Sequence, residues 1–139
     1  MLIGEFQHSL DSKGRVNFPA KMRDDLGSRF IVTKGMDSCL AVYPMEEWAV
    51  LESKIRALPM SKSRDLQRFL FAGAADLEPD KQGRVLIPQN LRDYAGLSKD
   101  VMIIGASVRA EIWDKARWEA SCSELTAEHV AMAMEELGF

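Results

Sequence analysis

The sequence predicts an α+β fold, rich in β-strands, in which two tandem pseudo-symmetric half-domains pack as one compact body with flanking helices. Three observations support this prediction: an internal repeat, alternating apolar and polar residues around two tight turns, and a length of 139 residues. A chain of this length suits one domain of ordinary size and buries about two-thirds of its unfolded surface. With 47% hydrophobic and 28% charged residues, the chain is neither disordered nor collagen-like.

An internal repeat organises the chain. Residues 11–19 (DSKGRVNFP) align with residues 80–88 (DKQGRVLIP), which gives the shared pattern D-x-x-G-R-V-x-Φ-P, where Φ is apolar. Matched positions continue at an offset of 69 and then 70, among them Arg23 and Arg92, Gly35 and Gly105, and Trp48 and Trp118. Self-similarity at a fixed spacing is typical of a duplicated supersecondary unit. The sequence therefore predicts two copies of one half-domain.

Each half is predicted to contain a β-hairpin, a short helix, two strands and a longer helix. In the first half, residues 5–10 alternate between apolar and polar side chains, as a half-buried strand does. The turn at 11–14 follows, because Asp caps its own following backbone and Gly tolerates positive φ. The remaining predicted elements are the strand 15–18, the helix 19–26 opened by proline and closed by glycine, the strands 30–32 and 40–43, and a helix that begins at Pro44.

The second half repeats this order. Its predicted elements are the strand 76–77, the turn 80–83, the strand 84–87, the helix 88–95, the strands 101–104 and 110–113, and a helix with Asp114 as its N-cap. Two amphipathic helices, 61–72 and 126–137, lie outside the repeat. We therefore divide the chain into a first repeat at 4–58, a connecting helix at 59–75, a second repeat at 76–120 and a C-terminal helix at 121–139.

Charge is distributed unevenly along the chain. The formal net charge is −3, but residues 1–35 carry +2, residues 36–109 are balanced and residues 110–139 carry −5. An acidic protein of this kind can still present a local basic patch. Cys39 and Cys122 lack metal or redox spacing, so we expect two buried or half-buried thiols without a disulfide. No apolar run approaches the roughly 18 residues that span a bilayer, and no membrane partner is predicted.

The two turns are the candidate functional sites, and they allow two interpretations. In the structural interpretation, Asp11 and Asp80 form Asx turns and pair across the turn with Arg15 and Arg84, which is worth about 0–1 kcal/mol at a surface. In the functional interpretation, a narrow basic tip enters a DNA groove, where Arg reads guanine edges and Lys neutralises phosphate. Lys13 and Arg15 cluster on one tip, which favours the second interpretation there.

Enzymatic and metal sites are weaker hypotheses. Two duplicated aspartates could meet as an acid-protease dyad, but the glycine positions of that motif hold Lys13 and Gln82, and the neighbouring arginines would keep both carboxylates ionised. His8 and His129 have no acidic or thiol partner at ligand spacing, so no metal, cofactor or small-molecule substrate is predicted. The basic face Lys62, Arg64 and Arg68 is read as solvated, with phosphate contact as the alternative.

The residues also carry a family resemblance. The stretches 4–15 (GEFQHSLDSKGR) and 19–23 (PAKMR) resemble the first half of MraZ-type transcriptional regulators. The stretches 71–74 (FAGA), 80–88 (DKQGRVLIP) and 111–114 (EIWD), with Trp118, resemble the second half. The resemblance implies two AbrB-like swapped-hairpin modules in one barrel-like body. Their shared D-x-x-x-R signature corresponds here to Asp11 with Arg15 and to Asp80 with Arg84.

This resemblance also implies a function. It indicates a bacterial, cytoplasmic and nucleoid-associated regulator, not an enzyme, which binds short direct repeats in double-stranded DNA upstream of its own division and cell-wall gene cluster, usually as a repressor. It also implies a ring-shaped homo-oligomer of the octamer class. The DNA-binding residues expected on this basis are Asp11, Lys13, Gly14 and Arg15 in the first turn, and Lys81 and Arg84 in the second. A ring-forming protein-interaction scaffold without specific DNA binding is the alternative.

Overall fold

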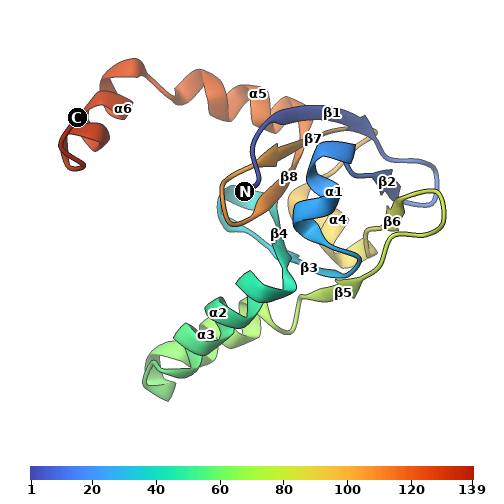
Figure 1. Cartoon of the computed structure of the whole chain (residues 1–139), viewed down its shortest axis with the longest axis horizontal. Coiled ribbons are helices and arrows are strands. Elements are labelled where there is room, and N and C mark those ends of the chain that lie inside the picture. Colours follow the sequence, from blue (N-terminus) through green and yellow to red (C-terminus); the bar gives the residue numbers. More distant parts are fainter.

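Eight short segments of the chain form β-strands, six of which make one antiparallel sheet (Figure 1). The computed structural model describes all residues from 1 to 139. The sheet has the order β1-β7-β8-β4-β3-β5, and β2 and β6 form a separate two-stranded ladder. The strands are β1 (Glu5–Ser9), β2 (Arg15–Asn17), β3 (Phe30–Lys34), β4 (Leu40–Pro44), β5 (Ala75–Leu77), β6 (Arg84–Leu86), β7 (Asp100–Gly105) and β8 (Ala110–Asp114).

Helices connect and flank these strands. The first four each follow a proline, whose fixed φ and missing N–H suit the start of a helix. A single 3₁₀ turn, η1 (Met36–Ser38), joins β3 to β4. None of the helices has the length and apolar character needed to span a lipid bilayer. The helices are α1 (Ala20–Leu26), α2 (Met45–Arg56), α3 (Met60–Leu70), α4 (Gln89–Ala95), α5 (Lys115–Glu124) and α6 (Ala127–Glu135).

The two halves exchange their first strands. β1 belongs to the first half but pairs with β7 of the second half, with Glu5 opposite Ile104. β5 belongs to the second half but pairs with β3 of the first half, with Leu77 opposite Phe30. β2 and β6, one from each half, pair with each other. The halves are therefore interlocked, as the prediction of one body requires.

The predicted β-hairpins are wrong in their strand pairing. The turns at 11–14 and 80–83 are present, but β1 does not form a ladder with β2, nor β5 with β6. Turn chemistry is local and can be read from the residues, whereas the partner of a strand is set by where its apolar face becomes buried. The strands that follow the two turns, β2 and β6, therefore pair with each other across the halves.

The barrel-like body implied by the family resemblance is not confirmed. The six-stranded sheet is open, with β1 and β5 at its two edges, and β2 and β6 form a separate ladder. The mixed α+β class of the prediction stands, with six strands in the main sheet and six α-helices in the chain.

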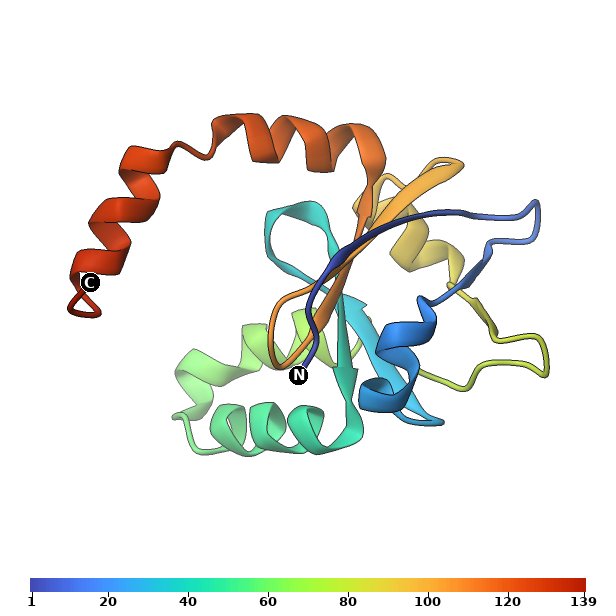
Figure 2. The same ribbon diagram turned by 45° about the horizontal axis from the view of Figure 1, so that its top comes forward.

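One hydrophobic core lies between one face of the sheet and a second layer made by β2, β6, α1 and α4 (Figure 2). Phe30 and Ile103 are buried on the sheet side, and Val16 and Val85 from the β2–β6 ladder face them. The largest cluster unites 17 buried residues from both halves. Since this cluster draws on both repeats, neither half has a core of its own.

The other face of the sheet is covered in two separate places. The α2–α3 hairpin packs over β3, where the hydroxyl of Thr33 donates to the carbonyl of Leu70 at 2.5 Å. At the opposite side, Trp118 of α5 packs against Trp113 with ring centroids 5.3 Å apart.

The chain ends in an arm that leaves the body. Beyond α5, the chain bends at Leu125 and continues into α6, far from the sheet in both ribbon views (Figures 1 and 2). Cys122, in the last turn of α5, is exposed and not half-buried as expected, whereas Cys39 is buried; both thiols are free. Asp114 stands at the N-cap position, but its carboxylate accepts hydrogen bonds from Ser98 instead of capping α5.

Candidate nucleic-acid interface

The first tip, residues 11–15, is a tight turn held together by one carboxylate. Oδ1 of Asp11 accepts hydrogen bonds from the backbone N–H groups of Lys13 and Arg15, each at 2.9 Å. Oδ2 of Asp11 accepts from Nε of Arg15 at 2.7 Å. The backbone N–H of Gly14 donates to the carbonyl of Asp11 at 3.0 Å, and its φ of +85° is one that glycine adopts without strain. The predicted Asx turn with its Asp–Arg pair is confirmed.

The second tip, residues 80–84, repeats this geometry almost atom for atom. Oδ1 of Asp80 accepts from the backbone N–H groups of Gln82 and Arg84 at 2.9 Å each, and Oδ2 accepts from Nε of Arg84 at 2.8 Å. Gly83 has a φ of +79°. The sequence repeat therefore corresponds to a repeat of hydrogen bonds.

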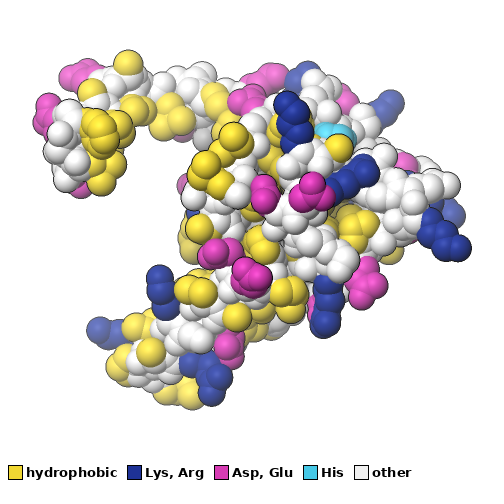
Figure 3. All heavy atoms as spheres, viewed as in Figure 1, with side chains coloured by type: hydrophobic (Ala, Val, Ile, Leu, Met, Phe, Trp, Pro, Cys, Tyr) yellow, Lys and Arg dark blue, Asp and Glu magenta, His cyan; other side chains and the backbone are white.

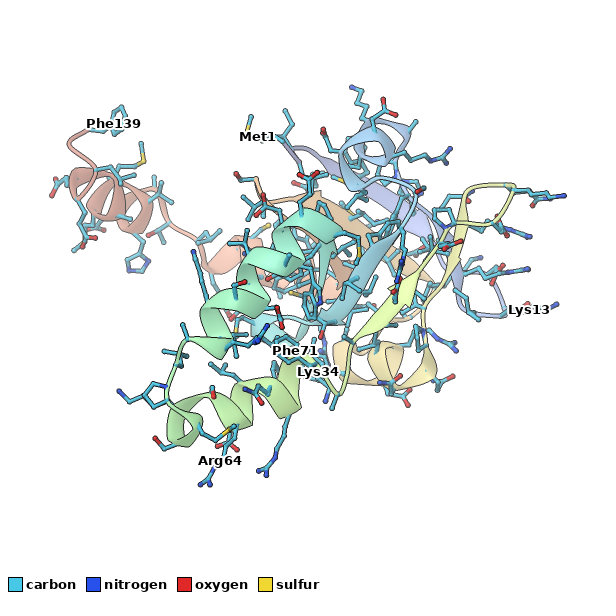
Figure 4. The ribbon with its side chains drawn as sticks, turned by 60° about the horizontal axis from the view of Figure 1, so that its bottom comes forward. Met1, Lys13, Lys34, Arg64, Phe71 and Phe139 are labelled. Carbon is cyan, nitrogen blue, oxygen red and sulfur yellow. The ribbon has the colours of Figure 1, made fainter.

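Both tips lie at the same end of the molecule, away from the arm and from the α2–α3 hairpin (Figures 1 and 2). The β2–β6 ladder holds them together, and the backbone N–H of Ile87 also donates to the carbonyl of Gly14 at 3.0 Å. Lysine and arginine side chains project from this end of the surface (Figure 3), and Lys13 points away from the body (Figure 4). The fold thus brings together two turns that are far apart in the sequence.

The tip arginines are anchored at one nitrogen only. Arg15 and Arg84 each use Nε for their aspartate, and their terminal Nη groups make no hydrogen bond within the chain. Both side chains are half-buried, with 29% and 31% of their surface exposed. An arginine held in this way keeps two donors in a fixed plane, which is the arrangement that contacts O6 and N7 of guanine or two phosphate oxygens.

Two further arginines brace the tips across the halves, and the sequence reasoning gave them no role. Nε of Arg23 donates to the carbonyl of Phe18 at 3.1 Å, and Nε of Arg92 donates to the carbonyl of Ile87 at 2.9 Å. The guanidinium of Arg92 from the second half lies against Gly14 of the first tip. That of Arg23 lies correspondingly against Gly83. The matched positions 23 and 92 in the repeat were the available signal for this pair.

The hydrogen bonds of the tips set the ionisation of their aspartates. The pKa of Asp11 is lowered to about 2, mainly by the backbone N–H of Arg15, with the Arg15 side chain and the backbone N–H of Lys13 as further causes. The pKa of Asp80 is also lowered, mainly by the backbone N–H of Arg84. Carboxylates that stay ionised in this way do not share a proton, so they do not suit an acid-protease dyad.

The predicted site residues differ in their solvent exposure and in their role in the turn. Lys13 and Lys81 are exposed and form no ion pair, so both are free for an external phosphate. Asp11 and Gly14 shape the turn: Gly14 is buried, and a side chain there would meet the Arg92 guanidinium at 2.5 Å. The chain has no cluster of three His, Cys, Asp or Glu side chains arranged for a metal ion.

A shallow cleft of about 550 Å³ separates the first tip from α4. Its wall is polar and mixed in charge, with Asp11, Ser12 and Asp93 beside Arg92 and Lys99. Few apolar groups line it, so it lacks the enclosed apolar surface of a small-molecule pocket.

These features define a class of protein: an interlocked tandem repeat that presents two Asp-anchored basic turns side by side. The family model described as "MraZ protein, putative antitoxin-like" matches the chain twice, at residues 1–69 and 70–137. The chain therefore belongs to the MraZ family, and the division of the two matches agrees with the repeat offset.

Curated relatives match most or nearly all of the chain. A protein of Acetivibrio thermocellus named transcriptional regulator MraZ is 56% identical over 142 residues, which covers 99% of both chains. A protein of the same name from Caldicellulosiruptor bescii is 54% identical over 99% of both chains. A third, from Natranaerobius thermophilus, is 59% identical over 121 residues, covering 86% of this chain and 85% of its own.

Proposed function

We propose that this chain is a sequence-specific DNA-binding transcriptional regulator that acts in the cytoplasm, on the nucleoid, and is not an enzyme. The observation that carries this proposal is the pair of matched basic tips at one end of the fold, each with an arginine whose Nη groups face no partner in the chain. The name of its relatives, transcriptional regulator MraZ, supports the same function.

In the proposed complex, the first tip enters a groove of double-stranded DNA. Arg15 contacts a base edge, because its guanidinium is held in plane by Asp11, and Lys13 neutralises a phosphate, because its ammonium is exposed and unpaired. Arg84 and Lys81 on the second tip contact the adjacent backbone. Asp11 and Gly14 do not touch bases and act by fixing the turn.

A single tip pair carries few cations and would bind weakly. We propose that the chain assembles into a ring-shaped homo-oligomer of the octamer class, which presents several tip pairs to short direct repeats in its own upstream region. Linking binding events in this way raises apparent affinity by about 10²–10⁴ without new contacts. Head-to-tail repeats in DNA match a cyclic head-to-tail assembly. Its regulatory role would be repression of the division and cell-wall gene cluster.

A gel-shift experiment tests this proposal. The full chain is titrated against DNA from its own upstream region and against a shuffled sequence of the same length, at 50 and 200 mM salt. We expect tighter binding to the upstream region at both concentrations, with a steep loss at the higher one. Equal binding to both sequences would contradict sequence-specific recognition. No binding to either, by a chain that still assembles, would favour the protein-interaction scaffold instead.

A further inference from the structure

The β2–β6 ladder has one buried face and one solvent face. Val16 and Val85, in the middle of the two strands, are 1% and 0% exposed and belong to the core. Successive side chains of a strand point to opposite faces, so the residues on either side of each valine point to solvent. These residues, which we call the ribbon face, are Arg15 and Asn17 of β2 and Arg84 and Leu86 of β6. The ladder thus presents a four-residue surface that joins the two tips.

The register of the ladder places each tip arginine beside a residue of the other half. Arg15 is directly opposite Leu86, and Asn17 is directly opposite Arg84. Opposite side chains of an antiparallel pair have Cβ atoms about 5 Å apart, and alternate residues of one strand lie about 7 Å apart. Base pairs are stacked about 3.4 Å apart. When Arg15 contacts a base edge, Leu86 and Asn17 therefore lie within about two base-pair steps of that contact.

Asn17 and Leu86 contribute little to the packing of the fold. Leu86 is 54% exposed, although it is a large apolar side chain on a strand. Asn17 is exposed, and the side-chain hydrogen bonds on either side of it belong to Arg15 and Arg23. The two residues occupy equivalent positions of the internal repeat, next to valines that are identical in both copies. The copies therefore share the side chains that build the ladder and differ in an exposed pair that does not build it.

The shape of the ladder suits the major groove of DNA. That groove is about 12 Å wide and admits a two-stranded β-ribbon. β2 and β6 pair only with each other, so no third strand widens the ribbon. Both ribbon views show the ladder leading into the two tips at this end of the molecule (Figures 1 and 2). The ladder can therefore follow the first tip into a groove that the six-stranded sheet is too wide to enter.

We propose that the ribbon face as a whole reads DNA, with Asn17 and Leu86 as specificity-determining residues beside Arg15. The amide of Asn17 has the donor and the acceptor that match N7 and the N6 amino group of adenine, and the side chain of Leu86 contacts the C5 methyl group of a thymine. Arg84 keeps its contact with the DNA backbone. This inference rests on the proposed function and names the base contacts that it leaves open.

The difference between Asn17 and Leu86 also removes the symmetry of the surface. A pseudo-two-fold axis through the Val16–Val85 pair relates Arg15 to Arg84 and Asn17 to Leu86. Identical side chains at all matched positions would favour a two-fold symmetric DNA site, as in dimeric regulators. Because one matched position holds an amide and the other an aliphatic group, the ribbon face prefers a sequence that is not palindromic.

Removal of single methyl groups from the DNA tests the contact of Leu86. Each thymine of the chain's own upstream region is replaced in turn by deoxyuridine, which lacks only the C5 methyl group. We expect one replacement in each bound repeat to weaken wild-type binding about threefold to fivefold in fluorescence anisotropy, and to leave Leu86→Ala unaffected. Leu58→Ala truncates an exposed leucine between α2 and α3, away from the tips, and should respond as the wild type does. If Leu86→Ala remains sensitive to the same methyl group, another side chain makes the contact.

A parallel replacement tests the contact of Asn17. Each adenine is replaced in turn by 7-deazaadenine, which has a carbon atom in place of the N7 acceptor. We expect one replacement to weaken wild-type binding about fivefold or more and to have no effect on Asn17→Ala. Asn17→Gln keeps the amide on a longer side chain and should retain the preference for adenine at that position. Equal sensitivity of wild type and Asn17→Ala at every adenine would refute the assignment.

The outcomes separate this inference from the proposed function. The substituted side chains are exposed, so circular dichroism and light scattering should give the same fold and mass for every variant. A wild type that prefers its upstream region, but is indifferent to every thymine methyl group and every adenine N7, would overturn the ribbon face and leave the proposed function standing. A wild type that binds upstream and shuffled DNA equally would overturn both.

Discussion

The two tips share one backbone and differ in surface chemistry. Each is closed by an aspartate that accepts from two backbone N–H groups and from an arginine Nε, with distances that agree to about 0.1 Å. The position before the glycine, however, is Lys13 in the first tip and Gln82 in the second, where the lysine stands one residue earlier. Duplication thus preserved the turn and left its exposed positions free to diverge. We expect the first tip to read DNA and the second to support it.

The largest expected effect comes from the tip arginines. Arg15→Ala should abolish specific binding while the assembly survives, since one bidentate base contact is worth about 1–3 kcal/mol, or roughly 5- to 150-fold, for every tip engaged. Arg84→Ala should cost less, because a backbone contact carries no sequence information. Fluorescence anisotropy with operator and shuffled DNA measures both. Equal losses of specificity would remove the distinction between the tips.

Replacing the glycine of each tip with alanine should lower the free energy of unfolding by different amounts. Gly14→Ala should cost about 1–3 kcal/mol in unfolding free energy, because its φ of +85° strains any other residue and its side chain would meet the half-buried guanidinium of Arg92. Gly83→Ala should cost less, since its neighbour Arg23 is exposed and stands at 3.0 Å instead of 2.5 Å. Urea unfolding of the two variants gives the comparison. A greater loss of unfolding free energy for Gly83→Ala would mean that the Arg92 side chain moves aside for an added side chain more easily than the Arg23 side chain does.

The lysines provide a smaller and more discriminating effect. Lys13→Ala should weaken binding to all sequences alike and flatten the slope of log K against log salt by about one unit per contact removed. Lys81→Ala should change the slope little, because its side chain starts one residue earlier in the turn. Titrations between 50 and 200 mM salt measure this. If the two slopes fall equally, both tips face DNA in the same way.

The smallest effect near neutral pH concerns the tip aspartates. The folded state lowers the pKa of Asp11 to about 2, so the ionised turn is stabilised above the ordinary value of 3.8 and loses that stabilisation as the pH falls toward 2. The pKa of Asp80 is lowered as well, so both tips should stay formed between pH 7 and 4. Carbon-detected NMR of the carboxyl groups can follow both titrations. An Asp11 midpoint at its ordinary value would show that the turn opens in solution.

The repeat in the sequence predicted the secondary-structure elements and the two tips, but not which strands pair with each other. The positions 11–15 and 80–84 carry enough local chemistry to specify an Asx turn, and the turns are where the sequence places them. The pairing of β1 with β7 depends on which apolar face is buried in the assembled core, and the alternation within β1 fits either partner. The bracing role of Arg23 and Arg92 could not be predicted for the same reason: their guanidinium groups lie against glycines of the other half.

The exchange of first strands has a consequence for how the protein is made. β1 pairs Glu5 with Ile104, so the first strand to leave the ribosome finds its partner only after most of the chain has been synthesised. Until then the nascent first half has an unpaired edge and no core of its own, because the central cluster draws on both repeats. Non-local pairing of this kind slows folding and leaves unpaired, aggregation-prone strand edges exposed until the pairing forms. The two repeats therefore mature together, after translation has passed β7, and not one after the other.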